Sequence, residues 1–288
     1  LDTAGVVAFP FAINREDLGF LKDSAGRGWV AGVFAELVVD DTAGRTVKSL
    51  NTYWTVNLRE EQEVGRVGYK VFNRFKTLLP PGLYSARLTV VDDVSKRSES
   101  LAFPSIVVNS PMSGLSIGGL SLAYRIDYVG DSVDSQAERL VDNGFLVLPN
   151  PLGVYNLSDS MLWLYAEVHG LQYDSSETRK YRVGCTMLDR SGQTSRDFGY
   201  AMREIPGKAA VVTQNLSLSG LERGVYRLQL AVQDMSNGEV DTARISFYYI
   251  ESEADLLSPR TAFDSLSLAE QVAALRYLMS PTEVTTLD

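Results

Sequence analysis

Histidine and cysteine are almost missing from this sequence, which has one of each among 288 residues. Imidazole and thiolate groups supply much of the acid–base, nucleophilic and zinc-binding chemistry of enzymes, so the usual sets of such residues are excluded. Cys185 has no partner for an internal disulfide and is expected to pack as a small apolar residue. Glycine motifs that cradle phosphates at the start of a helix are also missing. We therefore expect no catalytic residue, no bound metal and no cofactor.

An excess of positive charge is missing as well. Lys and Arg number 27 against 36 Asp and Glu, which gives a net charge of −9. Nucleic acids and anionic membranes bind basic surfaces, so neither is an expected partner. Residues 100–124 carry no charge, but prolines, glycines and serines interrupt them and would be unfavourable in lipid. No direct insertion into a membrane is expected.

The single histidine, His169, follows Glu167 by two residues on a predicted strand, so the two side chains can pair on one face. No serine or cysteine motif is placed to use such a pair, and we interpret His169 as a structural or surface residue. Three acidic pairs at predicted strand ends do not follow the calcium-loop pattern and are interpreted as turn residues. They are Asp40/Asp41, Asp92/Asp93 and Asp131/Asp134.

One sequence motif, referred to below as the repeated phrase, occurs twice in the chain. Gly-x-Tyr-x-x-x-Leu-x-Val-x-Asp begins at Gly82 and begins again 142 residues later at Gly224. Each copy reads as a turn glycine followed by a strand with one buried face. Repetition at this spacing predicts two related β domains in tandem. Tyr84 and Tyr226 are then expected to form equivalent tyrosine corners, in which the hydroxyl bonds a backbone group.

Short alternating segments separated by turns fill most of the chain, which is typical of β-sandwiches. A second echo, between residues 37–44 and 185–192, has an offset of 148 and fits the same duplication with loop insertions. We predict two tandem immunoglobulin- or fibronectin-like β-sandwiches of seven to nine strands each, followed by a short helical tail. Their predicted bounds are 1–110, 113–252 and 260–288, with the linker at 109–114.

The tail alone has helical spacing. A capping box at residues 267–270 precedes an apolar stripe of Leu268, Val272 and Leu275, which we expect to dock on a sandwich or on a neighbouring molecule. A second helix start at residues 280–283 is followed at once by the end of the chain, so we expect the native chain to continue or its end to fray. Because the chain begins at Leu1, we also expect that a preceding segment has been removed.

Four aromatic residues, in two clusters, are candidates for contact with a partner. Neighbouring residues on a strand face opposite sides, so some rings of the pair Tyr53/Trp54 and of the cluster containing Trp163 and Tyr165 must face outward. Outward rings can stack on sugars or contact another protein.

Several segments resemble the secreted bacterial proteins that carry a Gly-Trp-x-Thr-Asp (GWxTD) domain. The similar segments are residues 9–11, 18–20, 30–39, 115–122, 143–151, 164–171 and 275–283. The motif that names the family is absent from the chain. The resemblance implies tandem sandwiches and an extracytoplasmic bacterial location, and it supplies no catalytic residues.

These observations favour a non-enzymatic, extracytoplasmic structural or interaction protein. It would belong to an envelope or surface assembly, through protein partners or through self-association into a filament. The alternative is a carbohydrate-binding module that uses exposed aromatic rings to bind a glycan.

Overall fold

The structure is a computed structural model that describes residues 5–24, 26–66, 68–109, 114–130 and 137–250. Among these residues the only helices are three single turns of 3-10 helix, and nearly all other regular structure is β-strand. The short helices are η1 (Arg15–Asp17), η2 (Glu61–Glu63) and η3 (Glu138–Leu140). The predicted all-β class is confirmed. The predicted helical tail, with its stripe of Leu268, Val272 and Leu275, lies outside the described residues.

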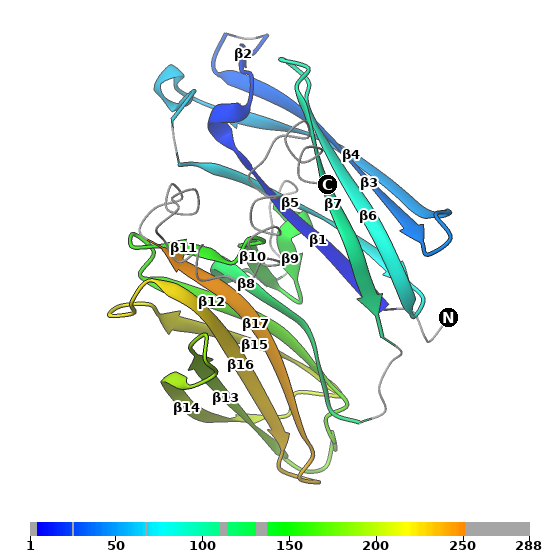
Figure 1. The fold of residues 1–288 in the computed structure, drawn as a ribbon, viewed down its shortest axis with the longest axis vertical. Helices are drawn as coiled ribbons and strands as arrows, with labels where there is room; N and C mark the ends of the chain where they lie inside the picture. Colours follow the sequence, from blue (N-terminus) through cyan, green and yellow to red (C-terminus); the bar gives the residue numbers. More distant parts are fainter. Residues whose placement is uncertain (1–4, 25, 67, 110–113, 131–136, 251–288) are drawn as a thin grey trace. The chain divides into compact units, whose positions relative to one another are not determined.

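The chain divides into two compact units, whose described residues lie within 5–109 and within 114–250 (Figure 1). In the first unit, β1 and β5 form one antiparallel sheet, and the second sheet has the order β2-β3-β6-β7 with β4 also paired to β3. Apolar side chains from both sheets, including Phe9, Phe11, Leu37 and Leu88, meet in one core. The strands are β1 (Gly5–Asn14), β2 (Leu21–Lys22), β3 (Trp29–Asp41), β4 (Thr46–Leu58), β5 (Lys70–Leu79), β6 (Gly82–Asp92) and β7 (Ser98–Val108).

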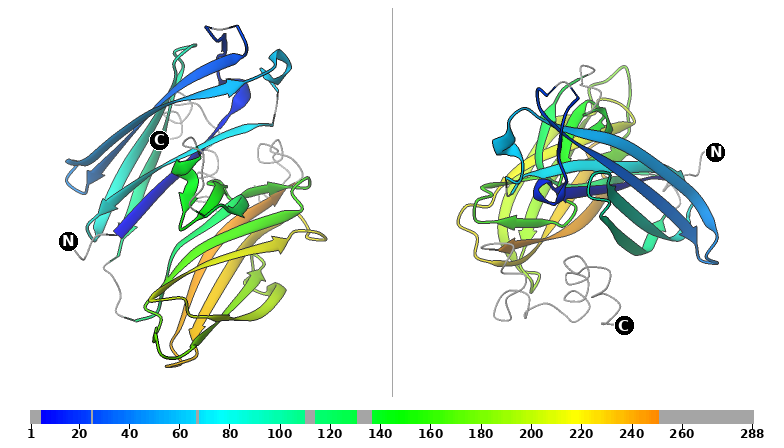
Figure 2. Two further views of the ribbon diagram at one scale, coloured as in Figure 1. Left: turned by 180° about the vertical axis from the view of Figure 1, so that it is seen from behind. Right: turned by 90° about the horizontal axis from the view of Figure 1, so that it is seen from above.

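The second unit is a sandwich of two five-stranded sheets, with orders β15-β12-β8-β10-β9 and β11-β17-β16-β13-β14 (Figure 2). Its core lies between the two sheets and includes Leu164, Met187, Leu230 and Phe247. The strands are β8 (Ser116–Tyr128), β9 (Val141–Asp142), β10 (Phe145–Pro149), β11 (Val154–Asn156), β12 (Met161–His169), β13 (Lys180–Leu188), β14 (Thr194–Glu204), β15 (Ala209–Ser217), β16 (Gly224–Asp234) and β17 (Val240–Ile250).

Both units are built on the same six strands. The order β4-β3-β6-β7 in the first unit matches β14-β13-β16-β17 in the second, and the pair β1-β5 matches β12-β15. The units differ in what is added to this framework. The second unit adds β8, β9, β10 and β11, whereas the first adds only the two-residue strand β2.

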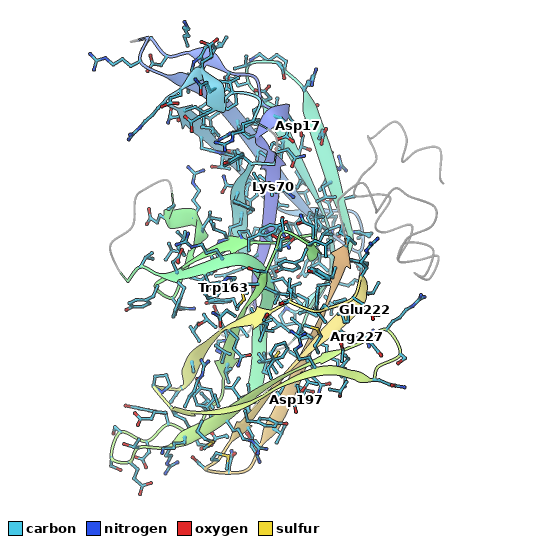
Figure 3. The ribbon with its side chains drawn as sticks, turned by 90° about the vertical axis from the view of Figure 1, so that its left-hand side faces the viewer. Asp17, Lys70, Trp163, Asp197, Glu222 and Arg227 are labelled. Carbon is cyan, nitrogen blue, oxygen red and sulfur yellow. The ribbon has the colours of Figure 1, made fainter. Side chains whose placement is uncertain are left out.

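The tyrosine corners are confirmed in both units. The Tyr84 hydroxyl donates a hydrogen bond to the Pro80 carbonyl (2.9 Å), and the Tyr226 hydroxyl donates to the Glu222 carbonyl (2.8 Å). Each acceptor lies four residues before its tyrosine, and Figure 3 labels Glu222. The repeated sequence phrase therefore folds into the same local structure twice.

The second pair of similar segments, residues 37–44 and 185–192, also forms the same hairpin turn in both units. Asp41 Oδ1 accepts a hydrogen bond from the backbone N–H of Arg45 (3.0 Å), and Asp189 Oδ1 accepts one from Gln193 (2.9 Å). Both turns contain a glycine with positive φ, which a side chain would make unfavourable. Asp41 is thus a turn residue, as its position at a strand end predicts.

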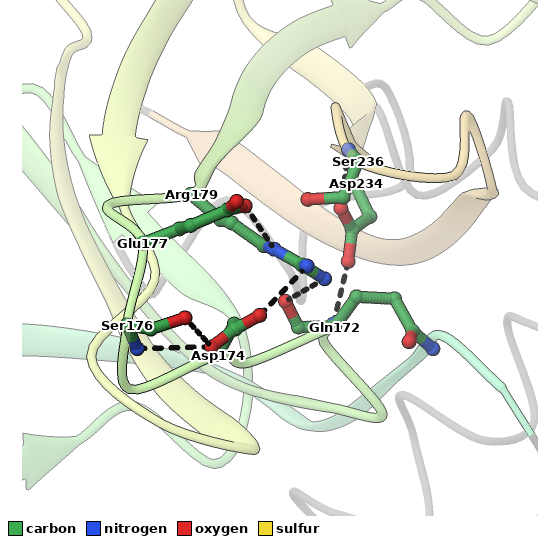
Figure 4. A network of polar contacts seen from close by, with 7 residues as sticks. All are labelled: Gln172, Asp174, Ser176, Glu177, Arg179, Asp234 and Ser236. Atoms are coloured by element: carbon green, nitrogen blue, oxygen red, sulfur yellow. Dashed lines mark hydrogen bonds and ion pairs between the residues drawn. The ribbon is translucent and has the colours of Figure 1, made fainter.

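The aspartate that ends each phrase ties its strand to a loop. Asp92 Oδ2 accepts a hydrogen bond from the backbone N–H of Gly19 (2.8 Å), and Asp234 Oδ2 accepts one from Gln172 (2.7 Å). Figure 4 shows the second contact together with that from Ser236. Both loops connect the first framework strand of their unit to the next. The structural use of these buried carboxylates goes beyond the predicted role in turns.

The number of strands agrees with the prediction for one unit only. Among the described residues the first unit has seven, whereas the second has ten, one more than the predicted maximum. The prediction missed β9 and β11, which have two and three residues. Segments of that length are too short to show an alternation of apolar and polar residues.

Candidate functional site

The most distinctive feature of the first unit is an open edge along β1. In the second unit the corresponding strand, β12, pairs with β15 on one side and with β8 on the other. β1 pairs with β5 alone, and no strand within residues 5–24, 26–66 or 68–109 pairs with its second edge. An unpaired strand edge presents backbone N–H and C=O groups that can pair with another chain.

The last strand of the first unit, β7, has an open edge of its own. Its counterpart β17 pairs in parallel with β11, whereas β7 pairs only with β6 in the described part of the unit. A Cβ added to Gly5 on β1 would lie 3.0 Å from a Val108 methyl on β7, and the rings of Phe9 and Phe103 meet edge to face at 5.6 Å. The two open edges therefore border the same side of the sandwich.

The hydrogen-bonding pattern shows which groups face outward. The N–H of Arg15 bonds the carbonyl of Tyr69 just beyond the β1-β5 pairing, so the odd-numbered residues of β1 face β5. The even-numbered residues turn their backbone groups to the open edge. They are Val6, Ala8, Pro10, Ala12 and Asn14. Pro10 has no N–H, so it interrupts the row of donors, a common protection of edge strands.

Apolar side chains are exposed beside these open edges. Val6 on β1 is 68% exposed and Val107 on β7 is 66% exposed. On β5, the outward residue Leu78 faces Val6 across the pair and is also exposed. A surface of this kind gains stability when a further strand covers it.

The outer face of the β1-β5 sheet is basic, in contrast to the acidic chain as a whole. The even-numbered residues of β1 and β5 share this face, and they include three basic residues but no acidic one. The basic residues are Lys70, Arg74 and Lys76. Lys76 lies opposite Ala8, and Arg74 lies opposite Pro10.

The first predicted aromatic pair divides between the two faces of β4. Tyr53 is 53% exposed, and its hydroxyl donates a hydrogen bond to Asp93 Oδ2 at 3.3 Å. Trp54 points the other way and packs edge to face on Phe11, with ring centroids 6.1 Å apart. Only Tyr53 of this pair presents its ring to solvent.

The second aromatic cluster lies on the outer face of β12. Trp163, labelled in Figure 3, is partly exposed and packs against the buried cluster of Ala123, Ile126, Val147 and Tyr165. Tyr165 is only 3% exposed, and its hydroxyl donates to Glu167 Oε1 at 3.1 Å. Tyr165 therefore offers no ring face to a ligand.

The pair of His169 and Glu167 forms as its spacing suggests, with 3.5 Å between Nε2 and Oε2. The His169 imidazole lowers the pKa of the Glu167 carboxyl, and the carboxylate in turn raises the pKa of His169. The Asn143 amide also donates to Glu167 (3.0 Å). These polar contacts join β12 to the turn before β10, so the cluster has a structural role.

Sequence reasoning missed another exposed ring, Tyr200 on β14. It is 62% exposed, and the Arg182 guanidinium lies over it at 4.4 Å. Its strand partner is Gly184, where an added Cβ would lie 2.3 Å from the ring, so the tyrosine lies flat across the glycine. A glycine inside a predicted strand was the available signal, because such glycines often mark a close approach.

Other chemistry is limited in the part of the chain that the structure describes. Cys185 is buried, as expected, and burial raises the pKa of its thiol to about 12. No group of three His, Cys, Asp or Glu side chains in the described ranges could hold a metal ion. No helix among the described residues is long and apolar enough to cross a membrane.

Neither a protein-family model nor a curated protein matches the chain. Among solved structures, a β-glucuronidase from Bacteroides uniformis is similar, with 10% identity and a TM-score of 0.29. The match covers 85% of this chain and 26% of the glucuronidase. An exo-chitosanase from Amycolatopsis orientalis in complex with PNP-β-D-glucosamine has 11% identity and a TM-score of 0.22, over 80% of this chain and 26% of its own. The chain thus spans about a quarter of the length of these enzymes.

Proposed function

We propose that this chain is a non-enzymatic, extracytoplasmic interaction protein that acts within a larger envelope or surface assembly. The open side of the first unit, bounded by β1 and β7, is the observation that carries the proposal. The second unit has strands at both corresponding positions, so the same framework can be closed, whereas these positions are unpaired within the described residues of the first unit. Strand addition at such an edge is a general mode of protein recognition.

The conspicuous side chains of the sequence support this function indirectly. Tyr84, Tyr226, Asp92 and Asp234 are engaged in holding their own units together. Backbone groups at the open side are therefore better placed than these side chains to bind a partner. The resemblance to GWxTD proteins supports the bacterial extracytoplasmic location.

The test is the mass of the native protein. Size-exclusion chromatography with light scattering, on protein purified from its native source, should give a fixed complex with a partner or a mass that grows with concentration. A strict monomer that carries a bound sugar would contradict the proposal.

Carbohydrate binding is the second candidate, favoured by the exposed rings of Tyr53 and Tyr200. Tyr200 lies flat on its sheet beside a guanidinium, which is a suitable geometry for stacking on a sugar. Binding of monomeric protein to a glycan array, lost in Tyr200→Ala or Tyr53→Ala but retained in Tyr165→Phe, would favour this candidate over the first.

A further inference from the structure

We infer that the Arg15 guanidinium binds a carboxylate through two parallel hydrogen bonds, donated by its Nε and Nη2 atoms. The carboxylate belongs either to a small organic acid or to an acidic group of another protein chain. The inference goes beyond the proposed function, because it does not depend on the addition of a strand to either open edge.

Arg15 is a buried arginine with two donors that lack acceptors. It begins η1, which ends at Asp17, labelled in Figure 3, and its side chain is only 8% exposed. Nε and Nη2 are both buried and have no hydrogen-bond partner among the described residues. A buried charged group is costly unless its N–H groups are bonded, and such an exception indicates an acceptor that binds there.

The two donors of Arg15 form one edge of the guanidinium plane. Their N–H bonds point in nearly the same direction, in the geometry that matches the two oxygens of a carboxylate. Water accepts such bonds too, but it leaves the positive charge of the buried group uncompensated. A carboxylate satisfies both the donors and the charge.

The contacts that Arg15 already makes use other parts of the residue. Its guanidinium carbon lies 4.3 Å from the centroid of the Tyr69 ring, so the ring meets the flat face of the group. The backbone N–H of Arg15 donates to the Tyr69 carbonyl at 2.7 Å. These contacts hold the guanidinium in place and provide no acceptor for its edge, so the site is preorganised for a ligand.

A single negative charge fits the surroundings of this edge. Arg66 lies over the same Tyr69 ring, with its guanidinium carbon 4.7 Å from the centroid. The backbone N–H groups of Glu60 and Arg59 lower the pKa of Glu63, and the two guanidinium groups lower it further. Glu63 Oε2 already accepts hydrogen bonds from those N–H groups, at 3.2 and 3.0 Å. One further monoanion would balance the two guanidinium groups, whereas a phosphate dianion would exceed them.

Arg182 in the second unit is a matched control. Its guanidinium also lies over a tyrosine ring, that of Tyr200, at 4.4 Å. Only its Nε lacks a partner, and the residue is half-buried. Among the described residues, an arginine with both donors of one edge buried and without a partner is found only at Arg15.

The test titrates sodium acetate into the full, ¹⁵N-labelled chain, with sodium chloride keeping the ionic strength constant. The Nε–Hε resonance of Arg15 is followed by NMR and is assigned by its loss in Arg15→Lys. It should shift saturably, with half-saturation at about 1–10 mM acetate, as suits so small a ligand. The corresponding resonance of Arg182 should not move.

Variants separate binding from a structural role. Arg15→Lys keeps the charge but loses the planar edge, so it should weaken acetate binding about tenfold, measured by the acetate-dependent rise in Tm. Arg15→Met removes a buried, uncompensated charge, so it should abolish that rise and should keep or raise the Tm in chloride alone. Arg182→Met should leave the effect of acetate unchanged.

Protein from the native source distinguishes the two origins of the carboxylate. A small organic acid would be released on denaturation, one molecule per chain, and detected by mass spectrometry. An acidic group of another protein would instead give a complex that acetate dissociates in the parent chain.

The absence of a saturable shift at Arg15 would overturn the inference. So would tighter binding of phosphate than of acetate at equal ionic strength, or a lower Tm of Arg15→Met in chloride with no effect of acetate on the parent. A strict monomer that carries a bound sugar would overturn the proposed function, but it would leave this inference in place if acetate binds at Arg15.

Discussion

The two units differ at one side of the sandwich, which added strands close in the second unit and which has no such strands among the described residues of the first. The second unit adds β8 and β11 there, and fills the space between the sheets with Tyr155, whose ring meets those of Tyr124 and Phe247. In the described part of the first unit, the rings of Phe9 and Phe103 meet at this side and Gly5 lies close to Val108. The six-strand framework is therefore sufficient to form a core, while the added strands decide whether backbone groups at this side are paired within the unit.

The first unit limits the risk that its open edge creates. Long, regular edge strands promote uncontrolled association, and proline is a common way to prevent it. Pro10 stands near the middle of β1. Pro10 therefore interrupts the row of outward N–H donors along this edge.

The largest predicted loss of stability follows from removing the aromatic rings that pack at this side of each unit, Tyr155 and Phe103. Tyr155 is fully buried and its hydroxyl donates to the Ala123 carbonyl at 2.9 Å, so Tyr155→Ala should destabilise the second unit by about 4 kcal/mol. Phe103 is partly exposed, and Phe103→Ala should cost the first unit about 2 kcal/mol. Denaturant unfolding of both variants measures the difference. Equal losses would show that the two closures contribute alike.

The next effect concerns the aspartates that hold the loops. Asp92→Ala and Asp234→Ala each remove a buried carboxylate that accepts part-buried hydrogen bonds from backbone N–H groups, and each should cost about 2–3 kcal/mol. Denaturant unfolding should give similar values for the two variants. A loss in only one unit would break the proposed equivalence.

Asp92 also predicts a dependence on pH. Burial raises its pKa, but the Ser95 hydroxyl and the backbone N–H groups of Gly19, Val94 and Ser95 together hold the pKa of Asp92 below its ordinary value. Because the folded pKa lies below the unfolded one, the stabilisation is present above pH of about 4 and is lost as pH falls through the folded pKa. Acid titration of stability should therefore be shallower in Asp92→Asn than in the parent chain. An identical slope would contradict this assignment.

The tyrosine corners should contribute less. Tyr84→Phe and Tyr226→Phe remove one hydrogen bond each and should each cost about 1 kcal/mol. The double variant should lose the sum, because the corners belong to separate units. Thermal unfolding of the three variants is the measurement, and strong non-additivity would be the contradictory result.

The smallest predicted changes in stability are at two equivalent turn positions, Lys96 and Gly238, each four residues after the aspartate that ends the repeated phrase. Lys96 and Gly238 both have positive φ, near 61° and 77°. Gly238→Ala should cost about 1 kcal/mol, whereas Lys96→Gly should be neutral or stabilising by a few tenths of that, about 0.3 kcal/mol. A loss of stability in Lys96→Gly would mean that its contact with Asp93, 2.6 Å away, outweighs the backbone strain.

Much of the fold could be predicted from the sequence because its signals are local. The repeated phrase fixes a turn, a tyrosine and an alternating strand within eleven residues, and both copies form as expected. The hairpin turns after β3 and β13 contain an aspartate and a glycine at the spacing that such turns require.

The open edge could not be predicted in the same way. Whether a strand lies beside β1 depends on pairing between distant segments, and the alternation in β1 and β12 is similar whether or not a neighbour is present. Trp54 and Tyr165 were candidates because their types suit binding, but alternation alone does not say which ring of a pair faces the core. A neighbouring strand and cross-strand contacts decide it.

The central claim is that the two units share one framework, closed in the second and open in the first. Amide hydrogen exchange of the free, full-length chain tests it most directly. Rapid exchange is expected at Val6, Ala8 and Ala12, and slow exchange at Trp163 and Tyr165, which face β8 at the corresponding edge. Slow exchange at the even-numbered residues of β1, equal to that of β12, would contradict the claim.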